Sequence, residues 1–298
     1  MTSKRATTSG SGGGELRALI SDAEHPLLLP GVPNALTARI VEEAGFGAVY
    51  LSGAGIANSF LGAPDVGLLT MTELVVHVAA VRSAVSLPIV VDADTGFGNA
   101  LNVRRTIVEL GRAGADAVQL EDQVAPKRCG HFTGKSVIPT EEMVGKIQAA
   151  LDSRPSDDFL VIARTDARAV HGLEDALDRV GRYREAGADV VFVEAPEGED
   201  ELRRIGENLD VPLVANMVEG GRTPLLSSAE LAKLGFTVQL YANAAMRAGM
   251  LAMQRMLAHL RATGDTRAVL DEMVTWQERQ RLVRKPEFDA LSQRYPSG

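Results

Sequence analysis

The sequence has a single cysteine, Cys129, few aromatic residues and no long hydrophobic run. One cysteine cannot form a disulfide within the chain, and without an apolar run of about 18 residues no transmembrane helix is predicted. The 39 acidic and 31 basic residues include no long run of either sign, which argues against binding to nucleic acids or to anionic membranes. These absences predict a cytoplasmic protein whose partner is a small molecule.

The N-terminal segment is rich in Ser, Thr and Gly and lacks the apolar centre of a secretory signal. We expect a disordered tail over residues 1–14, followed by a single domain with a C-terminal extension over residues 15–298. The basic, hydroxyl-rich composition of the tail is also compatible with a mitochondrial presequence, which stays open as an alternative.

Eight short apolar runs alternate with segments that suit helices. They span residues 26–32, 48–53, 89–94, 117–122, 159–166, 190–195, 212–218 and 238–243. Four junctions are near-copies in which a helix ends at a Gly suited to a left-handed C-cap and a strand follows: EEAGFGAVYLSG, GRAGADAVQLED, REAGADVVFVEA and AKLGFTVQLYAN. Near-continuous apolar strands indicate a parallel sheet covered on both faces, so eight such units predict a (β/α)8 barrel. A doubly wound open sheet is the alternative, but the sequence lacks its glycine-rich dinucleotide turn.

The C-terminal part continues the helical pattern. Apolar residues at helical spacing predict the eighth barrel helix just beyond residue 244, and a further helix is expected near 267–282, after Gly264. The last segment, 283–298, is too polar to belong to the barrel.

Polar residues follow the predicted strands, at the end of the barrel where catalytic groups gather in this fold. They are Ser52, Gly53 and Ala54 after the second strand, Asp92 and Asp94 after the third, Glu121 after the fourth, Arg164 after the fifth, Glu194 after the sixth and Asn216 after the seventh. The set mixes carboxylates with one cation, which indicates a charged site.

The two aspartates of this set lie two residues apart on a strand. Asp92 and Asp94 then point to the same side, and their repulsion calls for a cation. Oxygen ligands without nearby His or Cys favour Mg²⁺ or Mn²⁺, so with Glu121 and Glu194 they predict a metal site. The alternative is that the aspartates cap the next helix or pair with Arg104.

Two further rim features have a structural and a functional interpretation. The glycines after the second strand either make a tight turn or expose the amides of Ser52, Gly53 and Ala54 to a substrate carboxylate. Arg164 either forms a structural ion pair or clamps a substrate carboxylate with its planar guanidinium, which the nearby acids favour.

The loop PKRCGHFTGK, residues 126–135, contains the single cysteine. Cys129 stands beside Lys127, Arg128 and His131, and nearby cations favour the thiolate form. Glycines on both sides, Gly130 among them, allow the loop to move. The polar setting argues against a buried inert cysteine, and too few Cys and His residues are present for a zinc site.

The motifs SGAG, GAPDVGLLT, VDADTGFGN, LEDQVAPKRCGH, ARTDA, FVEA and NMVEGGRTP occur in this order. Together they resemble the isocitrate lyase/phosphoenolpyruvate mutase superfamily over roughly residues 26 to 260. The resemblance implies a homotetrameric barrel with an exchanged terminal helix that uses Mg²⁺ to bind a small 2-oxo or 2-hydroxy carboxylate.

The resemblance also assigns roles to individual residues. It implies metal ligation, mostly through water, by Asp92, Asp94, Glu121 and Glu194, and catalytic roles for Cys129, His131, Arg164 and Glu121. It implies substrate contacts from Ser52, Gly53, Ala54, Asp92, Gly130, Arg164, Glu194 and Asn216. The segment GAPDVG, with Asp65, corresponds to a gating loop in relatives.

The KRCGH sequence resembles that of the carbon–carbon lyases of the superfamily, of the 2-methylisocitrate and 2,3-dimethylmalate type. Cleavage of a 2-hydroxy acid needs a base, a metal and an acid that protonates the carbanion, and Cys129 is the candidate acid. Carboxyvinyl-carboxyphosphonate phosphonomutase shares KRCGH, and NMVEGG resembles oxaloacetate hydrolase, so phosphonomutase and oxaloacetate hydrolase or decarboxylase activity remain alternatives. A binding or scaffold protein is the non-enzymatic alternative.

Overall fold

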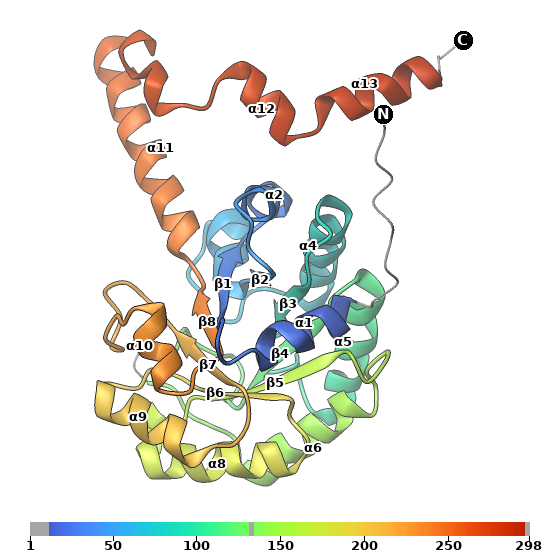
Figure 1. The fold of residues 1–298 in the computed structure, drawn as a ribbon, viewed down its shortest axis with the longest axis vertical. Helices are drawn as coiled ribbons and strands as arrows, with labels where there is room; N and C mark the ends of the chain where they lie inside the picture. Colours follow the sequence, from blue (N-terminus) through green and yellow to red (C-terminus); the bar gives the residue numbers. More distant parts are fainter. Residues whose placement is uncertain (1–11, 131–133, 296–298) are drawn as a thin grey trace.

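Eight parallel strands close into a barrel in chain order, with β8 paired to β1 (Figure 1). The structure is a computed structural model that describes residues 12–130 and 134–295. The strands are β1 Leu27–Val32, β2 Val49–Leu51, β3 Ile89–Asp92, β4 Ala117–Glu121, β5 Leu160–Thr165, β6 Val190–Val193, β7 Leu213–Asn216 and β8 Val238–Tyr241. The predicted (β/α)8 class is confirmed. Seven predicted runs continued one or two residues too far, because their polar ends leave the sheet at the rim.

The helices lie between the strands and beyond β8. They are α1 Gly12–Ser21, α2 Ala35–Glu43, α3 Gly53–Ile56, α4 Met71–Ala84, α5 Ala100–Ala113, α6 Thr140–Leu151, α7 Arg168–His171, α8 Leu173–Glu185, α9 Glu199–Asn208, α10 Ser228–Lys233, α11 Ala244–Thr263, α12 Trp276–Leu282 and α13 Lys285–Arg294. A π-helical turn, η1 Ala57–Leu61, and a 3-10 segment, η2 Arg267–Glu272, complete the set. The glycines of the four repeated junctions, Gly45, Gly114, Gly187 and Gly235, all have positive φ, as predicted.

The strands divide their side chains between two cores. One core lies inside the barrel and includes Leu29, Val90, Ile162 and Phe192. The other lies between the strands and the surrounding helices and includes alternate strand residues such as Val91. Since both faces of every strand are covered, the strands read as continuous apolar runs in the sequence.

The N-terminal end of the barrel is closed by α1. Leu16 and Ile20 of this helix are buried in the inner core together with first residues of several strands, among them Leu27 and Ala117. Because α1 begins at Gly12, the predicted tail boundary at residue 14 falls inside a helix. A Cβ at Gly12 would lie 2.3 Å from the Asp116 side chain, so this end of α1 packs tightly on the barrel. A ligand must therefore enter from the opposite end.

The C-terminal helices leave the barrel. Figure 1 shows α11 projecting away from the barrel, with α12 and α13 following it as the rest of an arm, and none of the three has a buried residue. The arm returns to the barrel at α2, where Arg281 of α12 pairs with Glu43. The helix expected to pack as the eighth barrel helix, α11, follows β8 as predicted, but it projects from the barrel and none of its residues is buried by the described chain. The helix expected near 267–282 is two segments, η2 and α12, separated before the N-cap Thr275. No helix in the described ranges is both long and apolar enough to cross a bilayer.

Two helical glycines provide a test of the packing around the barrel. A Cβ at Gly206 in α9 would lie 1.8 Å from the Leu234 carbonyl oxygen, whereas a Cβ at Gly181 in α8 would meet no atom within 4 Å. We expect Gly206→Ala to lower the free energy of unfolding by about 1 to 3 kcal/mol. Gly181→Ala, the matched control, should raise it by about 0.5 to 1 kcal/mol. Urea titrations would measure both, and equal effects would contradict this packing.

Candidate active site

The inward-facing side of the strands changes from apolar to polar toward the C-terminal end of the barrel. On β3, Val90 is followed by Asp92, and on β5, Ile162 is followed by Arg164. The guanidinium carbon of Arg164 lies 5.2 Å from the ring centre of Phe192, so the polar layer stacks directly on the apolar one. Alternate residues of a strand face the same side, so each strand contributes an apolar side chain to the core and, two residues later, a polar side chain to the site.

A cavity opens above this layer. Its lining consists of Tyr50, Ser52, Ala54, Asp65, Asp92, Lys127, Cys129, Gly130, Arg164, Glu194, Asn216, Val218, Leu240, Ala242 and Asn243. Eight predicted site residues are in this set, while Gly53, Asp94 and Glu121 lie behind it. His131 falls outside the described residues, so its catalytic role stays a prediction.

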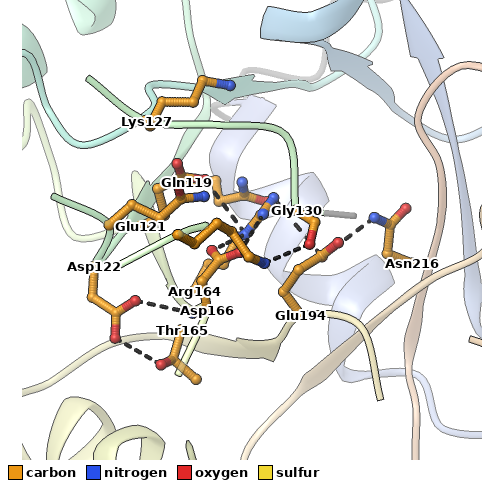
Figure 2. Close-up of polar contacts among 12 residues, drawn as sticks. Gln119, Glu121, Asp122, Lys127, Gly130, Arg164, Thr165, Asp166, Glu194 and Asn216 are labelled. Atoms are coloured by element: carbon orange, nitrogen blue, oxygen red, sulfur yellow. Dashed lines mark hydrogen bonds and ion pairs between the residues drawn. The ribbon is translucent and has the colours of Figure 1, made fainter. Parts of the chain in front are cut away.

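Arg164 is the centre of one charged cluster (Figure 2). Its Nε and Nη2 donate to the two carboxylate oxygens of Asp166, at 2.9 and 3.1 Å. Glu121 Oε2 lies 3.4 Å from Nε, and Glu194 Oε2 lies 3.8 Å from Nη1. The structural ion pair and the substrate clamp are therefore not exclusive: Asp166 holds the edge formed by Nε and Nη2, and Arg164 still lines the cavity.

The carboxyl group of Asp166 is fully buried and still ionised. Burial alone would raise its pKa, but the nearby Arg164 and Lys135 outweigh burial and lower the pKa to about 2. Lys135 Nζ lies 2.6 Å from Asp166 Oδ1. In contrast, burial raises the pKa of Glu121 well above its usual value, with Asp166 adding to the rise and Arg164 opposing it.

Lys127 is the centre of the second cluster. Its Nζ lies 2.6 Å from Asp65 Oδ1 and 2.8 Å from Asp94 Oδ1, and its side chain is 5% exposed. Asp94 therefore pairs with Lys127 and not with Arg104. Burial acts to lower the pKa of Lys127, but the carboxylates, Asp94 first, raise it well above the usual value. Burial raises the pKa of Asp94 to about 7 even though Lys127 opposes the rise.

The four predicted metal ligands are divided between these clusters. Asp92 and Asp94 lie over Gly53, where an added Cβ would sit 3.2 and 3.3 Å from their oxygens. Glu121 and Glu194 instead flank Arg164. Within the described ranges, no three Asp, Glu, His or Cys side chains come close enough to hold a metal ion by themselves. Lys127 pairs with Asp94, and Arg164 lies between Glu121 and Glu194. The sequence placed Arg164 among the rim acids, but it did not predict the position of Lys127.

Asp92 is the predicted metal ligand that faces the cavity most openly. Its carboxylate accepts only long hydrogen bonds, from Gly53 N and Asp94 N at 3.3 Å and from Gln119 Nε2 at 3.5 Å. Mg²⁺ is usually held by one or two carboxylates and keeps several waters. A single open carboxylate beside a polar cavity fits that requirement, although a closed four-acid cage does not form.

The turn after β2 uses its amides within the protein. Ser52 N–H donates to the Val32 carbonyl oxygen, and Gly53 N–H donates to Asp92. The Ser52 hydroxyl caps α3 by accepting from Gly55 N at 3.0 Å. The tight-turn interpretation therefore describes the contacts of the Ser52 and Gly53 amides. Ser52 and Ala54 line the cavity, and the carboxylate contacts expected of this turn stay a prediction.

The cysteine loop packs into the mouth of the cavity. Cys129 N–H donates to the Asp65 carbonyl oxygen at 3.1 Å, and Cys129 lines the cavity together with Lys127. Lys127, which the sequence placed beside the thiol, is also paired with Asp65 and Asp94. Gly130 is required by close approach: a Cβ there would lie 2.3 Å from Glu194 Oε1 and 2.5 Å from Arg164 Nη2.

Some features of the site were not predicted from the sequence. Asp166 could have been found, because it lies two residues after Arg164, just beyond the end of β5, where an extended chain would point both side chains the same way. Asp65 and Lys127 form an ion pair between distant loops, and no local pattern indicates it. The apolar lining residues Val218, Leu240 and Ala242 carry no chemical signature that separates them from the core.

Known proteins resemble this chain over nearly its whole length. A family model described as phosphoenolpyruvate phosphomutase matches residues 16–261. The chain is 46% identical to 2,3-dimethylmalate lyase of Eubacterium barkeri, over 95% of this chain and 98% of that protein. It is also 46% identical to carboxyvinyl-carboxyphosphonate phosphorylmutase of Arabidopsis thaliana, over 90% of this chain and 80% of that protein.

A solved structure adds information on ligands. The structure of a phosphonopyruvate hydrolase complex with oxalate and Mg²⁺ has a TM-score of 0.87 and 32% identity, covering 97% of this chain and 100% of that one. Relatives of this chain thus bind small carboxylates, and one of them binds Mg²⁺. The matches confirm what the motifs predicted: this chain belongs to the phosphoenolpyruvate mutase/isocitrate lyase superfamily of enzymes.

Proposed function

We propose that this protein is a Mg²⁺-dependent carbon–carbon lyase that cleaves a 2-hydroxy dicarboxylate of the 2,3-dimethylmalate type into pyruvate, or a similar 2-oxo acid, and a second carboxylate. The observation that carries the proposal is the cavity itself, where Cys129 lies beside Arg164, Asp92 and Glu194. The 46% identity to a 2,3-dimethylmalate lyase supports the same activity.

The lining of the cavity favours a dicarboxylate with alkyl substituents. Among the described lining residues, the cations are Lys127 and Arg164, and both already pair with protein carboxylates. A third substrate carboxylate would find no further cation there. Val218, Leu240 and Ala242 instead provide an apolar wall, against which methyl groups can pack.

The metal would be held mainly by Asp92. Asp94, Glu121 and Glu194 lie close enough to the cavity to orient metal-bound water, in keeping with the ligation expected from the sequence. Bound Mg²⁺ would supply a positive charge that stabilises the negative charge developing on substrate oxygens. Mn²⁺ satisfies the same oxygen ligands.

The chemistry of cleavage then follows from the groups around the cavity. The hydroxyl proton passes to one of the other lining carboxylates, Asp65 or Glu194. The oxygen forms the carbonyl of the 2-oxo acid as the bond between C2 and C3 breaks, and C3 keeps the electron pair. Cys129 donates its thiol proton to C3, which completes the carboxylate product. The proton held by the carboxylate later restores the thiol.

Arg164 positions the substrate in this scheme. Asp166 fixes one edge of the guanidinium, and the remaining edge can hold a substrate carboxylate. A guanidinium held this way loses little freedom when it binds, because its orientation is already set. The contact between Gly130 and the Arg164–Glu194 pair brings the thiol loop against the same carboxylate position.

We also propose a homotetramer in which the C-terminal arm packs on another subunit. The barrel has an apolar groove lined by Leu28, Pro30, Ile40, Val41, Ala44, Phe46, Ser228, Tyr241, Ala244 and Ala245. The arm exposes Met250, Met253 and Leu257 on α11. An exchanged α11 from a partner subunit would cover both apolar surfaces.

The substrate assignment is tested by a panel with Mg²⁺: 2,3-dimethylmalate, 2-methylisocitrate, isocitrate, oxaloacetate and carboxyvinyl-carboxyphosphonate. We expect the highest kcat/KM with 2,3-dimethylmalate or a close alkyl-substituted malate. Faster turnover of the phosphonate or of oxaloacetate would support the phosphonomutase or the hydrolase instead.

Cys129→Ser tests the proton donor. A hydroxyl is much less acidic than a thiol, so kcat should fall by roughly 100- to 10,000-fold. Binding of oxalate should change little, because the carboxylate contacts come from other residues. A serine variant that cleaves the best substrate near the wild-type rate would remove Cys129 from this role.

Asp92→Asn tests the metal site. Losing the open carboxylate should abolish Mg²⁺-dependent turnover and the increase in Tm that Mg²⁺ gives the wild-type protein. Asp175→Asn is a control, since that residue lies on α8 and pairs with Arg179. Retention of the Mg²⁺-induced Tm shift in Asp92→Asn would mean that the ion binds elsewhere.

Charged substitutions on α11 test the proposed homotetramer. Met253 and Leu257 are each 56% exposed. Replacing both with Glu should turn a tetramer into smaller species in light scattering, because buried charges at an interface are costly. An unchanged mass would show that α11 does not pack on another subunit.

A further inference from the structure

The loop after β4 is held by contacts at four consecutive residues. Lys127 pairs with Asp65 and Asp94, Arg128 contacts the side chain of Gln123, Cys129 N–H donates to Asp65 O, and the Gly130 carbonyl accepts from Lys135 Nζ. Most of these contacts involve groups that also belong to the charged clusters. The contact made by Gln123 does not.

The side chain of Gln123 forms two hydrogen bonds with the main chain of Arg128, the residue before the cysteine. Its Nε2 donates to the Arg128 carbonyl oxygen at 2.8 Å, and its Oε1 accepts from Arg128 N–H at 2.9 Å. The side-chain amide thus pairs with Arg128 as a neighbouring strand would. The two bonds also fix which amide atom is oxygen, because an N–H must face an acceptor and a carbonyl must face a donor.

Gln123 acts from behind the loop. The residue is 1% exposed and does not line the cavity where Cys129 and Arg164 meet. It faces a separate hollow formed by Val124, Ala125, Pro126, Arg128, Gly134, Lys135 and Ser136. Its own backbone is anchored by an antiparallel bridge to Val137, so the side chain is presented from a fixed position.

We infer that Gln123 is a positioning residue for the reaction, and that its two bonds to the Arg128 main chain set the position of the Cys129 thiol relative to the substrate. This inference rests on the proposed proton donation by Cys129. The carbonyl of Arg128 belongs to the peptide unit that continues into Cys129, so a rotation there moves the thiol directly. Proton transfer requires donor and acceptor atoms within hydrogen-bond reach, so a small displacement lowers kcat.

Making both bonds needs one donor and one acceptor, which the amide provides and an ionised carboxylate does not. Glutamate keeps the acceptor for Arg128 N–H but turns a carboxylate toward a carbonyl oxygen, and methionine removes both groups at similar volume. Gln123 is also a cleaner test than Lys135, because Lys135 holds Asp166 as well and its loss would disturb Arg164.

The experiment compares Gln123→Met and Gln123→Glu with wild type, each also in the Cys129→Ser background. With the best substrate of the panel, we expect kcat of Gln123→Met to fall by about 10- to 100-fold, the scale of one or two lost hydrogen bonds. KM and oxalate binding should change by less than about threefold, because no substrate contact is lost. In the Cys129→Ser background the same change should alter kcat by less than about twofold.

A second readout does not depend on turnover. The single cysteine can be alkylated with iodoacetamide, and a released loop should expose the thiol, so the alkylation rate of Gln123→Met should rise by about fivefold or more. If the panel shows no activity, this rate still tests the loop contact, and the failure then belongs to the proposed function alone.

Gln239→Met is the matched control. Gln239 is fully buried, and its Nε2 donates to the Ser228 carbonyl oxygen at 3.0 Å, on the outer side of β8. The Gln239→Met variant should be less stable than wild type but should have the same kcat and the same rate of Cys129 alkylation. Wild-type kcat and alkylation in Gln123→Met, or an equal loss of kcat with and without Cys129, would overturn the inference. If neither Gln123 variant folds, the contact serves the fold and the inference is likewise wrong.

Discussion

The pairing of buried cations with buried carboxylates is the interaction on which the rim of this barrel depends. Lys127 and Arg164 are 5% and 8% exposed, and a charge so far from water is tolerated only with partners of opposite sign. Removing one partner from a buried pair commonly costs about 3 to 5 kcal/mol, because the other charge is left alone. Side chains from β3, β4, β5 and β6 are therefore held in one arrangement by their mutual charges.

The balance of charge also explains why this layer suits a cation. Among the described residues it contains six acids and three cations: Asp65, Asp92, Asp94, Glu121, Asp166 and Glu194 against Lys127, Lys135 and Arg164. Burial disfavours the ionised form of these acids, and at Asp94 it raises the pKa to about 7, with Asp92 and Asp65 adding to the rise and Lys127 opposing it. A divalent ion relieves the excess negative charge of this layer, so Mg²⁺ and protons are alternative ways to neutralise one set of carboxylates.

The sequence predicted the barrel because each βα unit repeats the same local pattern, and it placed the candidate residues at the correct end because strand ends are local features. It did not predict how the charges pair. Asp65 and Lys127 come from different loops, and only the closed barrel brings them together. The sequence treated Lys127 as a cation beside the thiol and Asp94 as a metal ligand, whereas burial forces the two to pair. The outward course of α11 was also missed, since a helical pattern does not say what covers the helix.

The reactive groups of the site differ in how they are held. Asp92 and Arg164 lie on strands, so the hydrogen bonds of the sheet fix their positions before any ligand binds. Cys129 lies on a loop, where side chains must replace the missing sheet neighbours. Gly130 brings the cysteine loop against the residues held by the sheet. It lies so close to Glu194 and Arg164 that no side chain would fit. A shift of the loop therefore changes the distance from the Cys129 thiol to Arg164 and Glu194. The position of the thiol relative to a substrate carboxylate held by Arg164 thus depends on how the loop packs.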